Sequence, residues 1–264
     1  MPVTARMGGR VSRRLALGAV ALLVAGPVQA AERLVIAIDP PTTETNRFWV
    51  TSGGFGGIDP AFQRLIGNDL KTGAYDTSGL AARWQASADF KEWTFEIKPE
   101  AEFHFGWGPV TAADIELSHA LHSAPDSTLT GVQSLRGATV EIVDDKTIRF
   151  RFAEPRLDFD FANAGRGSLY IYSKKQHDAE GLAGYDRRPA GTGPYRYVER
   201  SPGRILFERV ENHWGGVTPD FPELELRFTT EGATKLAMLL SGEAHAANLP
   251  RELQGEAVAA GEGK

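Results

Sequence analysis

Alternation of apolar and polar residues is the most frequent pattern in this chain, and it predicts several β-strands. The clearest example is residues 93–97, where Trp93, Phe95 and Ile97 alternate with Thr94 and Glu96. This period of two residues is typical of a half-buried strand. Short apolar or alternating runs predict further elements: a core strand at 33–38, hairpins at 140–152 and 195–207, and a strand at 224–228.

Helices are fewer in the predicted pattern. One is expected over 111–122, with Thr111 as its N-cap and Asp114 three residues later as an acidic variant of the capping box. A second is expected over 230–241, where Gly242 would end it. Asp59 followed by proline predicts a third helix start, with an apolar face formed by Phe62, Leu65 and Ile66.

Strands and helices therefore alternate without a strict β-α-β order. This arrangement favours an α/β fold whose sheet is mixed and has substantial antiparallel content.

The first 30 residues have the three parts of an export signal. A basic segment carries Arg6, Arg10, Arg13 and Arg14, an uncharged apolar stretch follows, and small residues close it near Ala30. We expect cleavage near this point and a periplasmic location. Residues 12–17 partly fit a twin-arginine signal, so the export route stays open between the two pathways.

The charge and the cysteine content exclude several classes of partner and of chemical site. Four of the 29 basic residues lie in the signal, which leaves 25 against 34 acidic residues, a net charge of −9. An acidic chain without a basic patch argues against nucleic acid as a partner. The chain has no cysteine, which excludes thiol nucleophiles and thiolate metal sites. It also favours a soluble periplasmic protein over a lipoprotein.

The residues from 80 to 115 carry a resemblance to a known family. The ordered set Leu80-Ala81, Trp84, Asp89, Trp93-Thr94-Phe95, Phe103-His104, Gly108 and Thr111-Ala112-Ala113-Asp114 is similar to the signature of the family 5 extracellular solute-binding proteins. These proteins are the peptide-, nickel- and opine-binding components of ABC importers. A second set, comprising Gly191-Thr192-Gly193-Pro194-Tyr195 and Asn212-His213-Trp214-Gly215-Gly216, resembles later motifs of the same family.

The resemblance implies a fold and a mechanism. It implies a periplasmic-binding-protein-like first lobe over residues 31–264, with an inserted subdomain at about 66–189. The chain would then end before the second lobe. Function would consist of capturing a peptide-like or other small solute by hinge closure and delivering it to an ABC permease in the inner membrane. We expect a monomer that needs no cofactor and is not an enzyme.

The same resemblance points to the loop after the first strand as a wall of the solute cleft. Ligands in open α/β sheets bind outside the carboxyl ends of strands. The candidates are Thr42, Thr43, Glu44, Arg47 and Trp49, and we expect Phe48 and Trp49 to leave an apolar patch on the surface. Glu44 and Arg47 could take the amino and carboxylate groups of a solute, or they could be two solvated charges.

A loop at 123–134 offers two further candidates, Thr130 and Gln133, which the resemblance places beside the ligand.

Two other chemistries compete with solute binding. Asp158 and Asp160 alternate with apolar residues, so a strand would present both carboxylates on one face, and with His104 they could serve a secreted hydrolase. His119 and His122 lie three apart on a predicted helix, a spacing that can hold a metal. Such a site needs three or four converging ligands and no third one is spaced nearby, so we expect no metal. A ligand-sensing domain would share the fold but would need a fused membrane or DNA-binding segment.

Overall fold

The computed structural model describes residues 32–51, 57–69, 71–129, 132–160 and 169–261, which belong to one compact unit. The expected export signal and Thr130 lie outside the described residues. The strands are β1 (Arg33–Ile38), β2 (Gly67–Asn68), β3 (Tyr75–Asp76), β4 (Ala81–Ala86), β5 (Glu92–Ile97), β6 (Glu102–Phe103), β7 (Gly108–Pro109), β8 (Thr139–Asp144), β9 (Thr147–Arg151), β10 (Tyr195–Ser201), β11 (Arg204–Arg209), β12 (Glu223–Phe228) and β13 (Ala246–Ala247).

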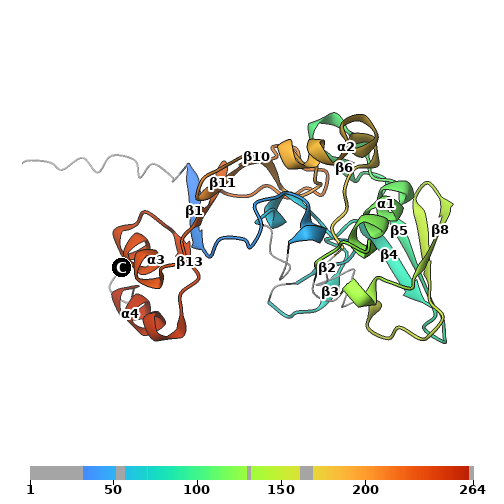
Figure 1. Cartoon of the computed structure of the whole chain (residues 1–264), viewed down its shortest axis with the longest axis horizontal. Coiled ribbons are helices and arrows are strands. Elements are labelled where there is room, and N and C mark those ends of the chain that lie inside the picture. The colour runs from blue at the N-terminus through green and yellow to red at the C-terminus, as the bar shows by residue number, and fades with distance from the viewer. Residues whose placement is uncertain (1–31, 52–56, 70, 130–131, 161–168, 262–264) are drawn as a thin grey trace, which may run out of the picture. The chain divides into compact units, whose positions relative to one another are not determined.

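The α-helices are α1 (Ala112–Ser123), α2 (Lys174–Arg187), α3 (Gly232–Ser241) and α4 (Arg251–Gly261), as Figure 1 shows. Four short 3-10 turns join them: η1 (Phe48–Val50), η2 (Asp59–Ala61), η3 (His104–Gly106) and η4 (Val132–Ser134). The mixed α/β organisation predicted from the sequence is confirmed. None of the described helices combines the length and the apolar character required to cross a membrane.

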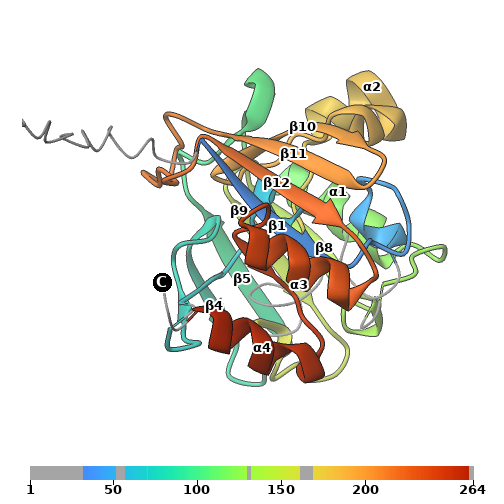
Figure 2. The same ribbon diagram turned by 90° about the vertical axis from the view of Figure 1, so that its left-hand side faces the viewer.

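A five-stranded sheet, which we call sheet A, has the order β10-β11-β12-β1-β13. Figure 2 shows its strands β10, β11, β12 and β1. Strands β10, β11 and β12 pair antiparallel, whereas β1 pairs parallel with both β12 and β13. The parallel pairs join segments far apart in the chain, with Arg33 opposite Glu223 and Ile36 opposite both Leu226 and Ala246. The carboxyl ends of three strands therefore meet at one edge of sheet A.

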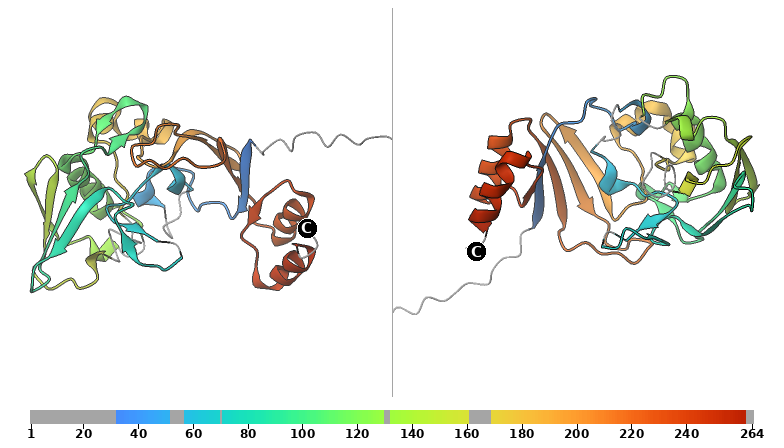
Figure 3. Two further views of the ribbon diagram at one scale, coloured as in Figure 1. Left: turned by 180° about the vertical axis from the view of Figure 1, so that it is seen from behind. Right: turned by 90° about the horizontal axis from the view of Figure 1, so that it is seen from below.

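The two faces of sheet A pack against different partners. On one face, Leu224, Leu226 and Phe207 join a core of aromatic residues that includes Tyr170 and Tyr172. On the other face, Val35 and Ala37 pack against Met238 of α3 and against Ala244. Helix α3 contacts β1, β13 and α4, and Figure 3 shows the α3–α4 pair beside β1.

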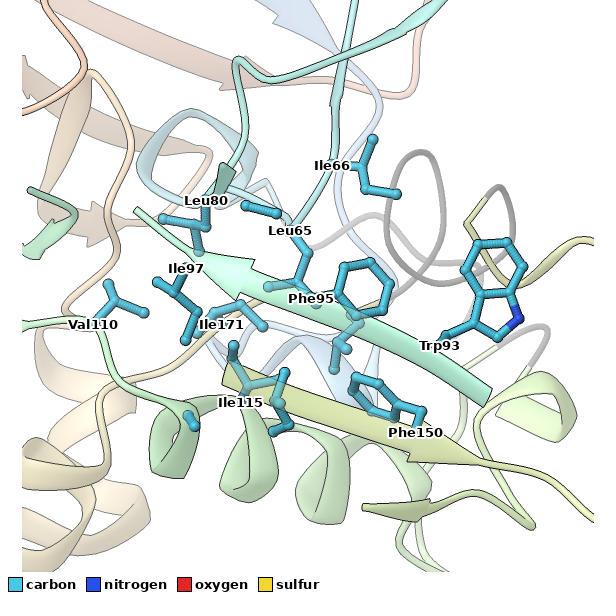
Figure 4. Packing of buried hydrophobic residues seen from close by; sticks show 14 of the residues in the cluster. Leu65, Ile66, Leu80, Trp93, Phe95, Ile97, Val110, Ile115, Phe150 and Ile171 are labelled. Carbon is cyan, nitrogen blue, oxygen red and sulfur yellow. The ribbon is translucent and has the colours of Figure 1, made fainter. Parts of the chain in front are cut away.

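A four-stranded antiparallel sheet, sheet C, has the order β4-β5-β9-β8. Its strands all come from residues 81–151. Figure 4 shows the apolar side chains gathered around β5, β9 and α1, including the fully buried Phe95 and Phe150, which meet edge to face. The predicted alternation in β5 is confirmed, because Trp93, Phe95 and Ile97 are buried while their neighbours are half-buried.

The caps predicted from the sequence are also present. The Asp114 carboxylate accepts hydrogen bonds from the backbone N–H and the hydroxyl of Thr111, each at 2.7 Å, so it closes the start of α1. It also accepts from the N–H of Lys174 at 2.6 Å, which ties α1 to the start of α2. Gly242 ends α3 in the left-handed conformation, with φ of 78°.

Two sequence predictions are wrong, and two helices were not predicted. The helix expected from Asp59 is only the turn η2, because the chain becomes extended at Phe62 and then bonds through Arg64 and Leu65 to residues 80 and 81. The strand expected around Asp158 is a turn entering helical backbone. Helices α2 and α4 were not predicted. Their sequences lack a sharp apolar stripe, and no residue of α4 is buried.

The motif at 191–195 is a point of close backbone approach. A side chain at Gly191 would place its Cβ 1.8 Å from the carbonyl oxygen of Ala61. The carbonyl of Gly191 accepts from the N–H of His104 at 2.9 Å, and the carbonyl of Gly193 contacts Nε2 of His104 at 2.8 Å. Glycine is therefore required at position 191 by packing between distant segments.

Candidate functional site

The edge where the carboxyl ends of β1, β12 and β13 meet is the candidate site. Asp39 directly follows β1, Thr229 follows β12 and Asn248 follows β13. The backbone joins them, because Thr229 N–H donates to Ile38 and Asn248 N–H donates to Ala37, both at 3.0 Å. In α/β sheets such an edge is the usual position of a ligand. We call this region the carboxyl edge.

A closed ring of polar side chains occupies the carboxyl edge. Lys235 of α3 donates from Nζ to Oδ1 of Asp39 at 2.8 Å and to Oδ1 of Asn248 at 3.1 Å. Asn248 in turn donates from Nδ2 to Oδ2 of Asp39 at 2.6 Å. The hydrogen bond from Lys235 and the one from Asn248 lower the pKa of Asp39, so this carboxylate is ionised at neutral pH.

The loop that leaves the carboxyl edge is also fixed at its far end. Thr45 donates its hydroxyl to Asp186 of α2 at 2.7 Å, and Asn46 donates to the backbone carbonyl of the same residue at 2.8 Å. Arg200 of β10 donates to the carbonyl of Thr45 at 3.2 Å and to Oδ1 of Asn46 at 3.0 Å. Residues 40–44 therefore form a short segment between two fixed ends, and all of them except the half-buried Pro41 are exposed.

The structure places the predicted binding residues in three different environments. Thr42, Thr43 and Glu44 are exposed on this segment. Arg47 is half-buried, and its Nε lies 3.1 Å from Oδ2 of Asp186. Trp49 is buried, with its ring edge-on to Tyr172 and Tyr185 at centroid distances of 5.1 and 6.2 Å.

The expected apolar surface patch at Phe48 and Trp49 is therefore wrong. These side chains are 1% and 3% exposed, because aromatic residues from 170–185 cover them.

Sequence reasoning missed the residues that hold the loop in place. Lys235, Asn248, Asp186 and Arg200 come from four separate segments, so their spacing carries no motif. One signal was available for Lys235. It lies three residues before Met238 on the same predicted helix face, which makes it a charged residue on a buried stripe.

The residues of the hydrolase alternative do not form a catalytic arrangement. His104 is buried, with Nε2 bound to Gly193 and Nδ1 buried without a hydrogen-bond partner among the described residues. Burial lowers the pKa of His104 to about 4. Asp158 is exposed on a turn, and Asp160 is half-buried at the following helical position. The carboxylates therefore do not share the strand face that the alternative required.

The histidines of α1 are core residues. His119 contacts the carbonyl of Leu135 at 3.0 Å, and His122 contacts the carbonyl of Ser118 at 2.7 Å. Burial lowers the pKa of both, to about 4 for His122. Within the described part of the chain, no three histidine, aspartate or glutamate side chains are grouped so as to hold a metal ion.

Comparison with known proteins identifies the family of this chain. Residues 77–264 match the family described as bacterial extracellular solute-binding proteins, family 5 Middle. The probable D,D-dipeptide-binding periplasmic protein DdpA of Escherichia coli (strain K12) is 28% identical over 216 residues, covering 78% of this chain and 40% of the relative.

Solved structures agree in fold. NikZ from Campylobacter jejuni in complex with Ni(L-His) has a TM-score of 0.73 at 20% identity, over 84% of this chain and 44% of that chain. DppA from Helicobacter pylori in complex with the peptide STSA has a TM-score of 0.67 at 23% identity, over 80% and 45%. The chain thus spans less than half the length of each of these proteins.

Proposed function

Because the chain belongs to the bacterial extracellular solute-binding proteins of family 5, we propose that it acts as the periplasmic substrate-binding component of an ABC importer. The members named above are binding proteins. In our proposal the signal at residues 1–30 exports the chain and is removed, a permease in the inner membrane receives the solute, and no bond is made or broken. The protein acts as a monomer without cofactor, metal or nucleic acid.

The carboxyl edge of sheet A is the observation that carries this proposal. It presents Thr42, Thr43 and Glu44 on a segment held at both ends, and such preformed loops bind with little ordering cost. This edge forms one wall of the cleft in our proposal, and hinge closure brings a second wall over the solute. Trp49 supports the wall from beneath rather than contacting the solute.

The charges on this segment favour a peptide-like solute. Glu44 is exposed and offers a carboxylate to a solute ammonium group. Arg47 contacts Asp186 through Nε, and its two terminal nitrogens have no hydrogen bond to another described residue, so in our proposal they donate to a solute carboxylate. A small peptide carries both groups. Two relatives agree with this class, since one is named for D,D-dipeptides and one was solved with a peptide.

The test is to purify the protein expressed from its intact gene and to measure binding by calorimetry. The probes are L-Ala-L-Phe, D-Ala-D-Ala and tri-alanine, and mass spectrometry identifies any solute that co-purifies. We expect at least one peptide to bind without being hydrolysed. Hydrolysis of a peptide would contradict the proposal. The proposal would also be contradicted if no peptide bound and a solute of another class co-purified with the protein.

Variants assign the roles within the site. Glu44→Gln removes the carboxylate and should weaken peptide binding by on the order of tenfold, the loss expected for one charge-assisted hydrogen bond. Glu100→Gln is the matched control, because it makes the same change at an exposed position after β5. Equal affinity of the Glu44 variant and the control would remove Glu44 from the site.

A further inference from the structure

Lys235 is a buried ammonium group in a helix that otherwise packs through apolar residues. Its side chain is 3% exposed, whereas the side chain of its partner Asp39 is 58% exposed. A buried charge is costly unless it is paired and hydrogen-bonded. Here two side-chain oxygens accept from the ammonium group, and both belong to residues that directly follow parallel strands.

The ring formed by Lys235, Asp39 and Asn248 joins two of the three segments that leave the carboxyl edge. Asp39 begins the loop that carries the proposed solute-binding residues, and Asn248 begins the connection from β13 to α4. Both oxygens of Asp39 and both ends of the Asn248 amide are used within the ring. The direction in which the chain leaves β1 is thus set by side chains rather than by the backbone ladder alone.

We infer that Lys235 is a positioning residue for solute binding. It touches no solute. By holding Asp39 from the buried side, it fixes the near end of the loop 39–47, while Asp186 and Arg200 fix the far end. A loop that is already ordered loses less entropy when a solute binds. This inference rests on the proposed function, because it assumes that the loop contacts the solute.

The test compares Lys235→Met with the wild type, both expressed from the intact gene. Methionine keeps the length and the apolar stem and removes the charge. We expect affinity for the tightest-binding of the three peptides to fall on the order of tenfold. Amide hydrogen exchange should become faster at residues 42–47 and stay unchanged in β5. Lys174→Met is the control, since it removes a 42% exposed side chain whose ammonium group pairs with Asp178 within α2.

Lys235→Arg, which keeps the positive charge, should recover most of the lost affinity. Faster exchange confined to residues 232–241 in Lys235→Met would show a role in helix packing alone and would overturn the inference. Unchanged affinity would overturn it as well, even if exchange in the loop became faster. If the wild type bound no peptide, the proposed function would fail separately. In that case, unchanged amide hydrogen exchange at residues 42–47 of Lys235→Met would still show that Lys235 does not position the loop.

Discussion

Sheet C and sheet A both combine a buried apolar face with charged residues, but they place their charges differently. On sheet C the charges pair across neighbouring strands on the outer face, as in Arg83–Glu96 at 2.6 Å and Arg149–Glu92 at 3.5 Å. These side chains are 28% to 76% exposed. On sheet A, Arg196–Glu208 and Arg204–Glu199 are exposed pairs of the same kind, but Glu225 is 1% exposed and is paired with Arg33 at 2.9 Å and Arg227 at 2.6 Å.

We interpret sheet C as a region that supports the fold and the carboxyl edge of sheet A as a region that positions the adjoining loop. Exposed ion pairs are screened by water and contribute little to stability. Covered charges need fixed partners, so they determine where their segments lie. We therefore expect the outer face of sheet C to tolerate substitution, whereas the buried Glu225 of sheet A and the buried Lys235 of α3 should not. Four measurements test this interpretation of the fold.

The scaffold role of sheet C is tested first by Trp93→Ala. Trp93 is 4% exposed, and its Nε1 donates to the carbonyl of Arg156 at 2.9 Å. We expect the free energy of unfolding to fall by about 3–5 kcal/mol in urea titrations, the usual cost of removing a buried large aromatic side chain. Trp84→Ala on the half-buried β4 should cost less. A change below about 0.5 kcal/mol at Trp93 would disprove its core role.

We expect the free energy of unfolding to decrease at acidic pH because two histidines are buried in the folded protein. Burial lowers the pKa of His104 and of His122 to about 4, compared with 6.5 in the unfolded chain. Between these values the unfolded state binds more protons, so stability falls as pH decreases from 6.5 to 4. The loss reaches about 3 kcal/mol per imidazole.

His122→Gln isolates one of these contributions in urea titrations across this pH range. The variant should lose part of the pH slope, because glutamine does not titrate. Burial raises the pKa of Asp114, which acts in the opposite direction and is common to both proteins. An unchanged slope in the variant would show that His122 titrates normally in the folded protein.

The close approach of Gly191 to Ala61 of η2 predicts a loss of stability of intermediate size when Gly191 is replaced. Gly191→Ala would place a Cβ against the carbonyl of Ala61, so we expect destabilisation of about 1–3 kcal/mol from overpacking. Gly255→Ala is the control, because its Cβ position in α4 has no described atom within 4 Å apart from its chain neighbours and the backbone of its own helix. There alanine should stabilise the helix by at most ~1 kcal/mol. Thermal melts distinguish the two, and equal effects would show that the close approach is absent.

The smallest effect is expected on the outer face of sheet C. Arg149 lies near Glu92 and Glu141 at 3.5 and 3.4 Å, and its side chain is 28% exposed. Arg149→Ala should change the free energy of unfolding by at most about 1 kcal/mol and leave peptide affinity unchanged. A loss of affinity would place this face in the binding function and would remove the contrast between the two sheets.

Much of the fold could be predicted because its causes are local. The alternation at 93–97 and the hairpin turn between β8 and β9 depend on residues within a few positions of each other. The same holds for the cap formed by Thr111 and Asp114 and for the stop at Gly242. The family could be predicted for a related reason, since its signature residues lie in order along the chain.

These local elements, the family and the loop beside the candidate site could thus be predicted from the sequence. Which residues of that loop are exposed depends on the tertiary structure. Asp39 meets Lys235 across 196 positions and Asn248 across 209, and Thr45 meets Asp186 across 141. Trp49 is buried because Tyr172 and Tyr185 arrive from a distant segment. Burial and pairing depend on which segments meet in space, and no periodicity within one segment records that.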